Sequence, residues 1–346
     1  MKNTQKLTLE QLEHRIVRLN EMVACKTAFI DARTPGSDEK ENFCLIGEGV
    51  TENPDQIIHI DIPHGFNIGA ARQPQGCKNS HHSHDTEEVF MIHSGTWQFT
   101  WGENGEDGSI IIGEGDTISL PANMFRGFEN VGQDDALMFS ILGLNSNGTA
   151  GQVVWAPYVF EQAEDYGLVL LEDGRLIDTA AGAIVPADGI VMAATTEADV
   201  KALDRLTAED MTKCIASQTE LESLNQGGHS GIDGVAEIAV IGVENENEGM
   251  AAGKMGWPHG FQLRRMHLEP GAVIDRHLRF EEEVVIVQQG SLDIICDDQS
   301  LTLSKGDLFS IPVASIRRFQ NSSLKPVHLW VVRRGDKPIS AQFTKP

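Results

Sequence analysis

Two histidines and a glutamate lie close together in the sequence, as His82-Ser83-His84 followed by Glu88. Alternate residues of an extended strand point to the same face, and these three residues all have even numbers. Imidazole and carboxylate groups are common ligands of divalent metals in proteins. The pattern therefore predicts a metal site, whereas His81 and His93, which have odd numbers, should point away from it.

The same spacing recurs in the second half of the chain. Pro63-His64-Gly65-Phe66 returns 195 residues later as Pro258-His259-Gly260-Phe261. The same offset relates four further pairs, namely Gly76/Gly271, His82/His277, Glu88/Glu283 and Gly95/Gly290. After a four-residue shortening, five more pairs follow, namely Gly115/Gly306, Pro121/Pro312, Arg126/Arg317, Phe128/Phe319 and Asn130/Asn321. An internal repeat of this length predicts two copies of one β fold. His64 and His259 precede a strand in each copy, so we expect them to be turn residues.

The repeated residues resemble the two sequence motifs of the cupin superfamily. The first motif is Gly, five residues, His-x-His, three or four residues, Glu, six residues and Gly. The first copy matches every spacing, and the second copy has Arg279 at the second His. The second motif is Gly, five residues, Pro-x-Gly, two residues, His, three residues and Asn. Both copies carry Arg where this motif has His, as Arg126 and Arg317, and Asn123 and Ala314 replace its second Gly.

This resemblance covers about residues 55–145 and 250–335 and implies a bicupin, which is a chain with two cupin domains. We expect a fold dominated by β-structure, with two β-barrel domains of the double-stranded β-helix or jelly-roll type. The expected segments are an N-terminal helix and arm (1–54), an N-terminal barrel (55–149), a connector with a hairpin and helices (150–235), and a C-terminal barrel (236–346). Gentisate and quercetin dioxygenases are bicupins of similar size and serve only as distant analogues.

The resemblance also implies a ligand set, since cupin metal sites use three His and one Glu. His82, His84 and Glu88 would be the ligands of the N-terminal barrel, and Arg126 stands in the place of the third His. A guanidinium offers a metal no lone pair. Two His and one carboxylate can hold one divalent metal; Fe(II) is our preferred metal, and Mn, Ni or Zn also fits. Glu88 and Arg126 would then be catalytic, with Arg126 and Phe128 binding the substrate. The alternative is a degenerate site in which Arg126 forms an ion pair with Glu88.

The second barrel keeps fewer of the expected ligands. His277 and Glu283 remain, whereas Arg279 and Arg317 occupy the two other ligand positions. These four residues could bind an anionic substrate group, because two guanidinium groups hold a carboxylate or phosphate in a bidentate way. The preferred alternative is a structural ion network in a barrel without a ligand. His267 and His328 lie on neighbouring predicted strands, where packing roles are the simpler interpretation.

Composition narrows the classes of partner. Lys and Arg number 27 against 51 Asp and Glu, a formal charge of −24, which argues against nucleic acid and anionic membranes as partners. The five cysteines are scattered and show no CxxC, so a disulfide framework is not expected. The N-terminus lacks the apolar core of a secretory signal, and no apolar run approaches the roughly 20 residues that span a bilayer. We expect a cytoplasmic protein.

Short apolar runs punctuated by Gly, Pro, Asn and Asp predict strands. They lie at 43–47, 57–62, 88–93, 97–101, 109–113, 116–120 and 136–142, and the strand pattern returns from residue 235. Residues 7–20 predict a short helix with a capping box formed by Thr8 and Gln11. Residues 167–179 predict a hairpin around Asp173-Gly174, and 194–224 predict one or two helices with Thr caps.

Together these features favour a metal-dependent bicupin enzyme that acts on a small acidic or oxygenated metabolite through its N-terminal barrel. A non-haem iron dioxygenase-type oxidoreductase is the preferred activity. Two alternatives stay open: a metal-dependent lyase or isomerase, which needs only Lewis acidity, and a non-catalytic small-anion-binding bicupin. The expected partner is a small anionic substrate, and the resemblance also implies a homodimer.

Overall fold

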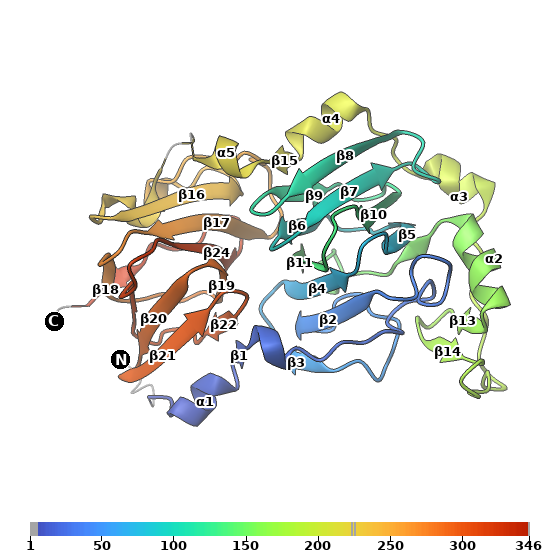
Figure 1. Cartoon of the computed structure of the whole chain (residues 1–346), viewed down its shortest axis with the longest axis horizontal. Coiled ribbons are helices and arrows are strands. Elements are labelled where there is room, and N and C mark those ends of the chain that lie inside the picture. Colours follow the sequence, from blue (N-terminus) through green and yellow to red (C-terminus); the bar gives the residue numbers. More distant parts are fainter. Residues whose placement is uncertain (1–5, 223, 225, 345–346) are drawn as a thin grey trace. The chain divides into compact units, whose positions relative to one another are not determined.

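A computed structural model describes residues 6–222, 224 and 226–344 (Figure 1). The chain divides into two compact units. One comprises Val23–Ser217 and contains the N-terminal barrel; the other comprises the chain up to Met22 together with Gln218 onward and contains the C-terminal barrel. The expected connector, residues 150–235, is thus divided between the two units after Ser217. The expected N-terminal segment, residues 1–54, is divided between them after Met22.

The N-terminal barrel consists of two sheets. The first has the strand order β12-β5-β10-β7-β8, and the second the order β15-β9-β6-β11-β4-β2-β3. The strands of the first sheet are β5 (Lys78–Ser83), β7 (Thr96–Trp101), β8 (Gly108–Gly113), β10 (Arg126–Asn130) and β12 (Val154–Trp155). Those of the second are β2 (Glu41–Ile46), β3 (Ile58–Ile60), β4 (Asn67–Gln73), β6 (Glu88–Ile92), β9 (Thr117–Leu120), β11 (Ala136–Leu142) and β15 (Ile215–Ala216). Neighbouring rings of Phe90, Phe99 and Phe128 pack between the sheets, with centroids 5.2–5.7 Å apart.

The C-terminal barrel repeats this arrangement with the strand orders β1-β22-β19-β24-β17-β16 and β21-β20-β23-β18-β25. The strands of the first sheet are β1 (Ile16–Val17), β16 (Val235–Ile241), β17 (Phe261–Leu268), β19 (Glu283–Gln289), β22 (Leu308–Ile311) and β24 (Val327–Arg334). Those of the second are β18 (Val273–Leu278), β20 (Ser291–Cys296), β21 (Gln299–Ser304), β23 (Arg317–Gln320) and β25 (Gln342–Phe343). Leu and Val side chains dominate its buried core.

The apolar runs of the N-terminal half all form strands, so that part of the prediction is confirmed. The apolar runs in the sequence do not predict β4, however. Its sequence is NIGAARQ. Gly and Ala have low β propensity and show no apolar alternation, which is why the pattern fails there. β4 nevertheless pairs along its length with β11 and β2 in the middle of its sheet.

The helical predictions are only partly right. Thr8 and Gln11 form the expected capping box, but the helix α1 spans only Leu9–Glu13. Ile16 and Val17 instead form β1, which pairs with Phe309 and Leu308 of β22. These β-branched residues favour a strand where a sheet edge is available to pair with them.

The region 194–224 forms three short helices rather than one or two. They are α3 (Glu197–Ala202), α4 (Ala208–Lys213) and α5 (Gln218–Leu221). Thr196 and Thr207 cap the first two, as expected. A further helix, α2 (Pro157–Asp165), precedes the predicted hairpin, which is present as β13 (Leu168–Leu170) and β14 (Leu176–Asp178). Short 3-10 turns lie at Leu19–Glu21, Gly228–Gly231 and Glu246–Glu248.

The repeated Pro-His-Gly-Phe segments have the same local structure in both units. Nδ1 of His64 contacts the carbonyl oxygen of Ile62, and Nδ1 of His259 contacts that of Trp257. The glycine that follows has φ = 78° in each copy. The two histidines are turn residues, as predicted. None of the helices in the described part of the chain has the length and apolar character that a membrane crossing requires.

Candidate metal centre

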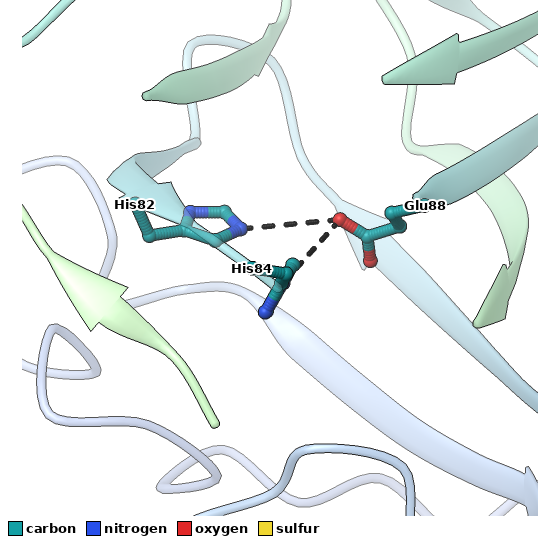
Figure 2. A group of neighbouring side chains, drawn as sticks. All are labelled: His82, His84 and Glu88. Atoms are coloured by element: carbon teal, nitrogen blue, oxygen red, sulfur yellow. Dashed lines mark ion pairs between the residues drawn. The ribbon is translucent and has the colours of Figure 1, made fainter. Parts of the chain in front are cut away.

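The three expected ligands lie where two strands that are consecutive in the sequence, β5 and β6, are joined by a turn. His82 lies in β5, His84 directly follows that strand, and Glu88 is the first residue of β6. β5 and β6 belong to different sheets, so the turn between His84 and Glu88 joins the two walls of the barrel. The structure brings all three side chains together, as the shared parity predicted (Figure 2).

The distances between these side chains are compatible with a metal site. Nε2 of His84 lies 3.6 Å from Oε2 of Glu88, and Nε2 of His82 lies 4.0 Å from the same oxygen (Figure 2). The ligand atoms of all three residues lie within 4.8 Å of one another. A metal ion at roughly 2.1 Å from each ligand holds neighbouring ligand atoms about 3 to 4 Å apart. The cluster is therefore close to the geometry that a bound ion would impose.

Both imidazoles have a backbone carbonyl oxygen beside Nδ1. Nδ1 of His82 lies 2.8 Å from the carbonyl oxygen of Ser80, and Nδ1 of His84 lies 3.4 Å from that of Gln152. A carbonyl oxygen only accepts, so these two contacts are hydrogen bonds when each Nδ1 carries the proton, and that tautomer leaves each Nε2 with a lone pair. Burial, reinforced by the positive charge of Arg126, holds the pKa of both histidines well below the usual value. Both rings are therefore neutral, which is the form that binds a metal.

Glu88 is shared between this cluster and a buried arginine. Arg126 lies on β10 opposite His82 of β5. Its guanidinium donates to Oε2 of Glu88 at 3.3 Å and to the carbonyl oxygen of Met124 at 3.2 Å. Burial raises the pKa of Glu88, and Arg126 opposes that rise. The structure therefore contains both the Arg126–Glu88 ion pair expected of a degenerate site and the group of His82, His84 and Glu88 expected of a metal site.

The donor set fits a divalent metal that keeps open coordination positions. It offers two neutral imidazoles and one carboxylate, and Arg126 supplies no ligand in the remaining position. Such a set suits Fe(II), and Mn or Zn can also use it. Of the described residues, only these three form a group of His, Cys, Asp or Glu side chains close enough to share an ion.

The cluster lines a cavity of about 670 Å³, counting its open mouth. The walls are mainly aromatic and aliphatic, with a few amides and hydroxyls between them. The aromatic lining residues are Phe29, Phe43, Phe90, Phe128 and Trp155. Phe128, which is predicted from the sequence to bind the substrate, is one of the residues that line this cavity. Arg126 is fully buried beside Glu88 and is not among the residues that line the cavity.

A buried polar network behind His82 was not predicted from the sequence. Asn79 places its Nδ2 3.2 Å from Nδ1 of His82 and accepts a hydrogen bond from Lys40 at 2.8 Å. Lys40 pairs with Asp31, and both side chains are fully buried. Asp31 also accepts from the backbone N–H of Ser80, whose carbonyl orients His82. Lys40 and Asp31 lie in a polar segment that reads as an ordinary loop, so no sequence signal marked them.

A second unpredicted group packs against the His82 ring. Trp155 packs against His82 with ring centroids 5.3 Å apart. Its Nε1 donates to Oε1 of Glu52 at 2.6 Å, and Oε2 of Glu52 accepts from the backbone N–H of Ile30 at 2.7 Å. Burial raises the pKa of Glu52 to about 8. The carboxyl is therefore largely protonated near neutral pH.

The corresponding region of the C-terminal barrel contains an ion network. Four buried arginines and three buried glutamates alternate in it, namely Arg264, Arg279, Arg317, Arg333, Glu237, Glu248 and Glu283. Glu283 contacts three of these arginines: Arg317 at 3.1 Å, Arg333 at 2.7 Å and Arg279 at 3.2 Å. These arginines hold the pKa of Glu283 well below its usual value, despite burial.

The guanidinium groups of Arg279 and Arg317 are thus already engaged by carboxylates. Arg279 also donates to Glu248 at 2.7 Å and to the carbonyl oxygen of Ile339 at 2.9 Å. The ring of His277 lies 5.2 Å from that of His229 and donates through Nδ1 to the carbonyl oxygen of Asp275. The structure therefore brings Arg279, Arg317 and Glu283 into direct contact.

Three other histidines are not part of either cluster, and the position of His81 predicted this. His81 contacts the hydroxyl of Tyr158 at 3.0 Å and that of Thr100 at 2.9 Å. His267 and His328 lie opposite each other on β17 and β24, with ring centroids 4.6 Å apart. Their roles are consistent with packing and local hydrogen bonding.

Two barrels, one with a candidate metal site and one filled with ion pairs, define the class of this chain. Residues 71–142 and 264–333 each match the cupin domain family. The chain is therefore a bicupin. No curated protein matches it by sequence.

Several solved structures share the fold at low sequence identity. Oxalate decarboxylase from Lactobacillus farciminis, solved as a formate complex, is 11% identical with a TM-score of 0.54, over 95% of this chain and 88% of that one. Oxalate decarboxylase from Bacillus subtilis at pH 4.6 is 12% identical with a TM-score of 0.53, over 97% and 79%. Vicilin from Corylus avellana (hazelnut) is 11% identical with a TM-score of 0.52, over 93% and 86%. Because decarboxylases and a vicilin share this fold, it does not by itself define an activity.

Proposed function

We propose that this bicupin is a metal-dependent enzyme whose active site is the cavity of the N-terminal barrel. One observation carries the proposal: His82, His84 and Glu88 line a cavity with their ligand atoms within 4.8 Å of one another, and Nδ1 of each imidazole lies beside a carbonyl oxygen. Second-nitrogen hydrogen bonds of this kind orient metal-ligating histidines in proteins. A purely structural barrel has no need of this arrangement.

We assign His82, His84 and Glu88 as the ligands. A bound divalent metal would supply Lewis acidity and, if it is Fe(II), the redox chemistry of an oxygen-using enzyme. Arg126 holds the Glu88 carboxylate at 3.3 Å and thereby positions a ligand. Phe128 and Trp155 form part of the wall against which a substrate packs. The buried Lys40–Asp31 pair supports the backbone of Ser80, whose carbonyl oxygen lies beside Nδ1 of His82.

The finer proposal is an Fe(II)-dependent oxidoreductase of the dioxygenase type. Its support is the donor set of two His and one carboxylate, which leaves room for both a substrate and O₂. A lyase or isomerase on the same site would consume no oxygen. The likeness to oxalate decarboxylases concerns the fold at 11–12% identity and does not favour either activity.

We also propose that the C-terminal barrel has a structural role. Four guanidinium groups and three carboxylates form ion pairs with one another there, and breaking such a buried pair is costly. The groups of Arg279 and Arg317 that would hold an anion are bound to Glu283. An oxidoreductase site in the N-terminal barrel needs nothing from this network.

The deciding experiment is metal analysis of the untagged full chain after incubation with Fe(II) or Mn(II). About one metal per chain is expected, and it should be lost in the double variant His82→Ala/His84→Ala. His81→Ala is the matched control, because His81 belongs to the same strand but contacts Tyr158 and Thr100. Equal metal content in the double variant would refute the site.

A second measurement addresses the dioxygenase part. Nitric oxide is an uncharged mimic of O₂ and should change the electron paramagnetic resonance spectrum of the Fe(II)-loaded chain. A spectrum unaffected by nitric oxide would rule out open positions for O₂ and leave only the redox-neutral activities.

A further inference from the structure

The cavity of the N-terminal barrel offers a ligand mainly apolar surface. Five aromatic rings line it, and Ile68, Leu142, Val50 and Val153 extend the same surface. Apolar walls with a few fixed polar groups are typical of sites that bind most of a ligand's body by burial. A ligand without such a body would gain little from these walls.

The buried cations near the cavity are not available to a ligand. Arg126 is paired with Glu88, and Lys40 is paired with Asp31 and donates to Asn79. Neither side chain lines the cavity, and none of the described lining residues is a Lys or an Arg. Glu48 and Glu88 are the charged lining residues of the described chain. A second negative group on a ligand would therefore be buried without a cation, which is costly.

One polar group in the wall lacks a partner within the protein. Nδ2 of Asn42 makes no hydrogen bond, and the side chain of Asn42 lines the cavity although the residue is only 9% exposed. Buried donors without a partner are rare in folded proteins. This amide can donate to an uncharged oxygen on a ligand.

The space itself comes from small residues at the centre of the sheet. Gly69 of β4 lies opposite Ser140 of β11. A Cβ on Gly69 would lie 3.0 Å from Oγ of Ser140 and 3.2 Å from the carbonyl oxygen of Phe43. A larger residue at either position would therefore reduce the cavity.

We propose that this cavity binds a ligand with a ring-sized apolar body and a single oxygen-donor end directed at His82, His84 and Glu88. The ligand carries no second charged group. This inference rests on the proposed function for the orientation of the ligand, and it narrows the substrate from small acids in general to apolar compounds with one oxygen-bearing end. A small dianion would leave one charge unpaired in the cavity.

The test compares four probes on the Mn(II)-loaded full chain and on the metal-free full chain, using calorimetry. The probes are 2-naphthoate, 2,6-naphthalenedicarboxylate, acetate and oxalate. We expect 2-naphthoate to bind at least about tenfold more tightly than each of the others, because only it combines an apolar body with one charge. Acetate, oxalate or the dicarboxylate binding as tightly as 2-naphthoate would overturn the inference.

The metal-free measurement separates this inference from the proposed function. If the chain binds no metal but still prefers 2-naphthoate to acetate, the proposed function fails and the apolar cavity stands. If the chain binds metal at His82 and His84 and shows no preference for 2-naphthoate, the proposed function stands and this inference fails.

A substitution tests the position of the body. Ser140→Leu should weaken 2-naphthoate binding at least about tenfold by filling the cavity, while Mn(II) content is retained. Val331→Leu is the matched control, because Val331 has the corresponding position in the C-terminal barrel. Unchanged 2-naphthoate affinity in a folded Ser140→Leu chain would overturn the inference. Should that variant fail to fold, the order of the four probes on the unmodified chain decides.

Discussion

Gly69 and Arg264 occupy the same position in the two barrels, and they decide whether each barrel is hollow or filled. Gly69 lies opposite Ser140 across β4 and β11, and Arg264 lies opposite Val331 across β17 and β24. Gly69 has no side chain, and this leaves room for the cavity that His82, His84 and Glu88 line. The fully buried guanidinium of Arg264 instead contacts Glu237 and Glu248.

Two further pairs of corresponding positions are also uncharged in the first barrel and charged in the second. Asn42 lies opposite Ala71 in the first barrel, and Glu237 lies opposite Met266 in the second. Leu142 lies opposite Asn67, and Arg333 lies opposite Gln262. Uncharged residues of the N-terminal barrel are therefore replaced by members of the ion network. One fold thus supports a cavity in one copy and a closed, charged interior in the other.

Replacing Arg126 by His should restore a third imidazole to the candidate metal centre. Position 126 lies opposite His82 in the register of β10 and β5, next to the existing ligands. We expect Arg126→His to bind Zn(II) or Mn(II) at least about tenfold more tightly than the unmodified chain, because a ligand replaces a cation. Competition with a chromophoric chelator measures this affinity. Arg126→Gln is the control, since it removes the charge and adds no imidazole; equal affinities of the His and Gln variants would contradict the prediction.

The buried network behind His82 should affect both stability and metal binding. Lys40→Met leaves Asp31 without its cation in a fully buried place, which should lower the free energy of unfolding by about 3–5 kcal/mol. Asn79 loses its hydrogen bond from Lys40, so metal affinity should fall about 10- to 100-fold. Urea denaturation and metal titration measure the two effects. The double variant Lys40→Met/Asp31→Asn should recover part of the stability, and a double variant no more stable than the single one would count against this account.

The ion network should make the C-terminal barrel sensitive to acid. The pKa values of Glu237 and Glu283 lie below the ordinary value of 4.5, chiefly because Arg333 and Arg317 outweigh the effect of burial. The folded protein therefore binds fewer protons than the unfolded chain as the pH falls below about 5. Their contribution to stability is complete above that pH and is lost as the pH falls towards the lowered values. Urea denaturation between pH 7 and pH 3 should show this decline.

Arg333→Leu provides the corresponding mutational test. The substitution removes the buried cation that pairs with Glu237 and Glu283. It should therefore destabilise the protein by about 3–5 kcal/mol at pH 7. The destabilisation should shrink at pH 4, where the carboxylates begin to bind protons. Arg318→Leu is the control, because Arg318 pairs with the exposed Asp275 and should matter by less than about 0.5 kcal/mol. A destabilisation by Arg333→Leu that is equal at the two pH values would contradict the role of charge.

Glu52 should have the opposite dependence on pH. Burial raises its pKa from 4.5 to about 8, so the folded protein retains a proton that the unfolded chain releases near pH 4.5. The stabilising effect of that proton is complete below pH 4.5 and is lost as the pH rises through about 8. The unmodified chain should therefore lose stability relative to Glu52→Gln between pH 6 and pH 9, by up to a few kcal/mol at about 1.4 kcal/mol per pKa unit.

The fluorescence of Trp155 offers a direct observation of this proton, because Trp155 donates to Glu52. We expect a change in emission centred near pH 8 in the unmodified chain and its absence in Glu52→Gln. The variant Trp155→Phe identifies the source of the signal. A pH-independent difference in stability between the unmodified chain and Glu52→Gln would show that Glu52 is ionised throughout.

The sequence by itself determined the two-barrel fold and the cluster of His82, His84 and Glu88. Both are encoded locally: apolar runs ended by turn residues specify strands, and the spacing of His82, His84 and Glu88 marks the cluster, with the turn after His84 carrying Glu88 onto the other sheet. The repeat then doubles the signal, since the Pro-His-Gly-Phe turns and the Gly and Glu positions recur in register. The odd number of His81 likewise predicted that it points away from the cluster, and in the structure its ring contacts Tyr158.

Tertiary structure alone decided what surrounds that cluster. β4 carries no apolar pattern, yet it forms the wall opposite Ser140 because the neighbouring strands supply its hydrogen bonds. Lys40 meets Asn79 across 39 residues, and Glu52 meets Trp155 across 103, so no local spacing relates them. Arg126 and Glu88 likewise meet only when two strands of different sheets close the barrel. Long-range packing brings such partners together, and burial then sets their charge states.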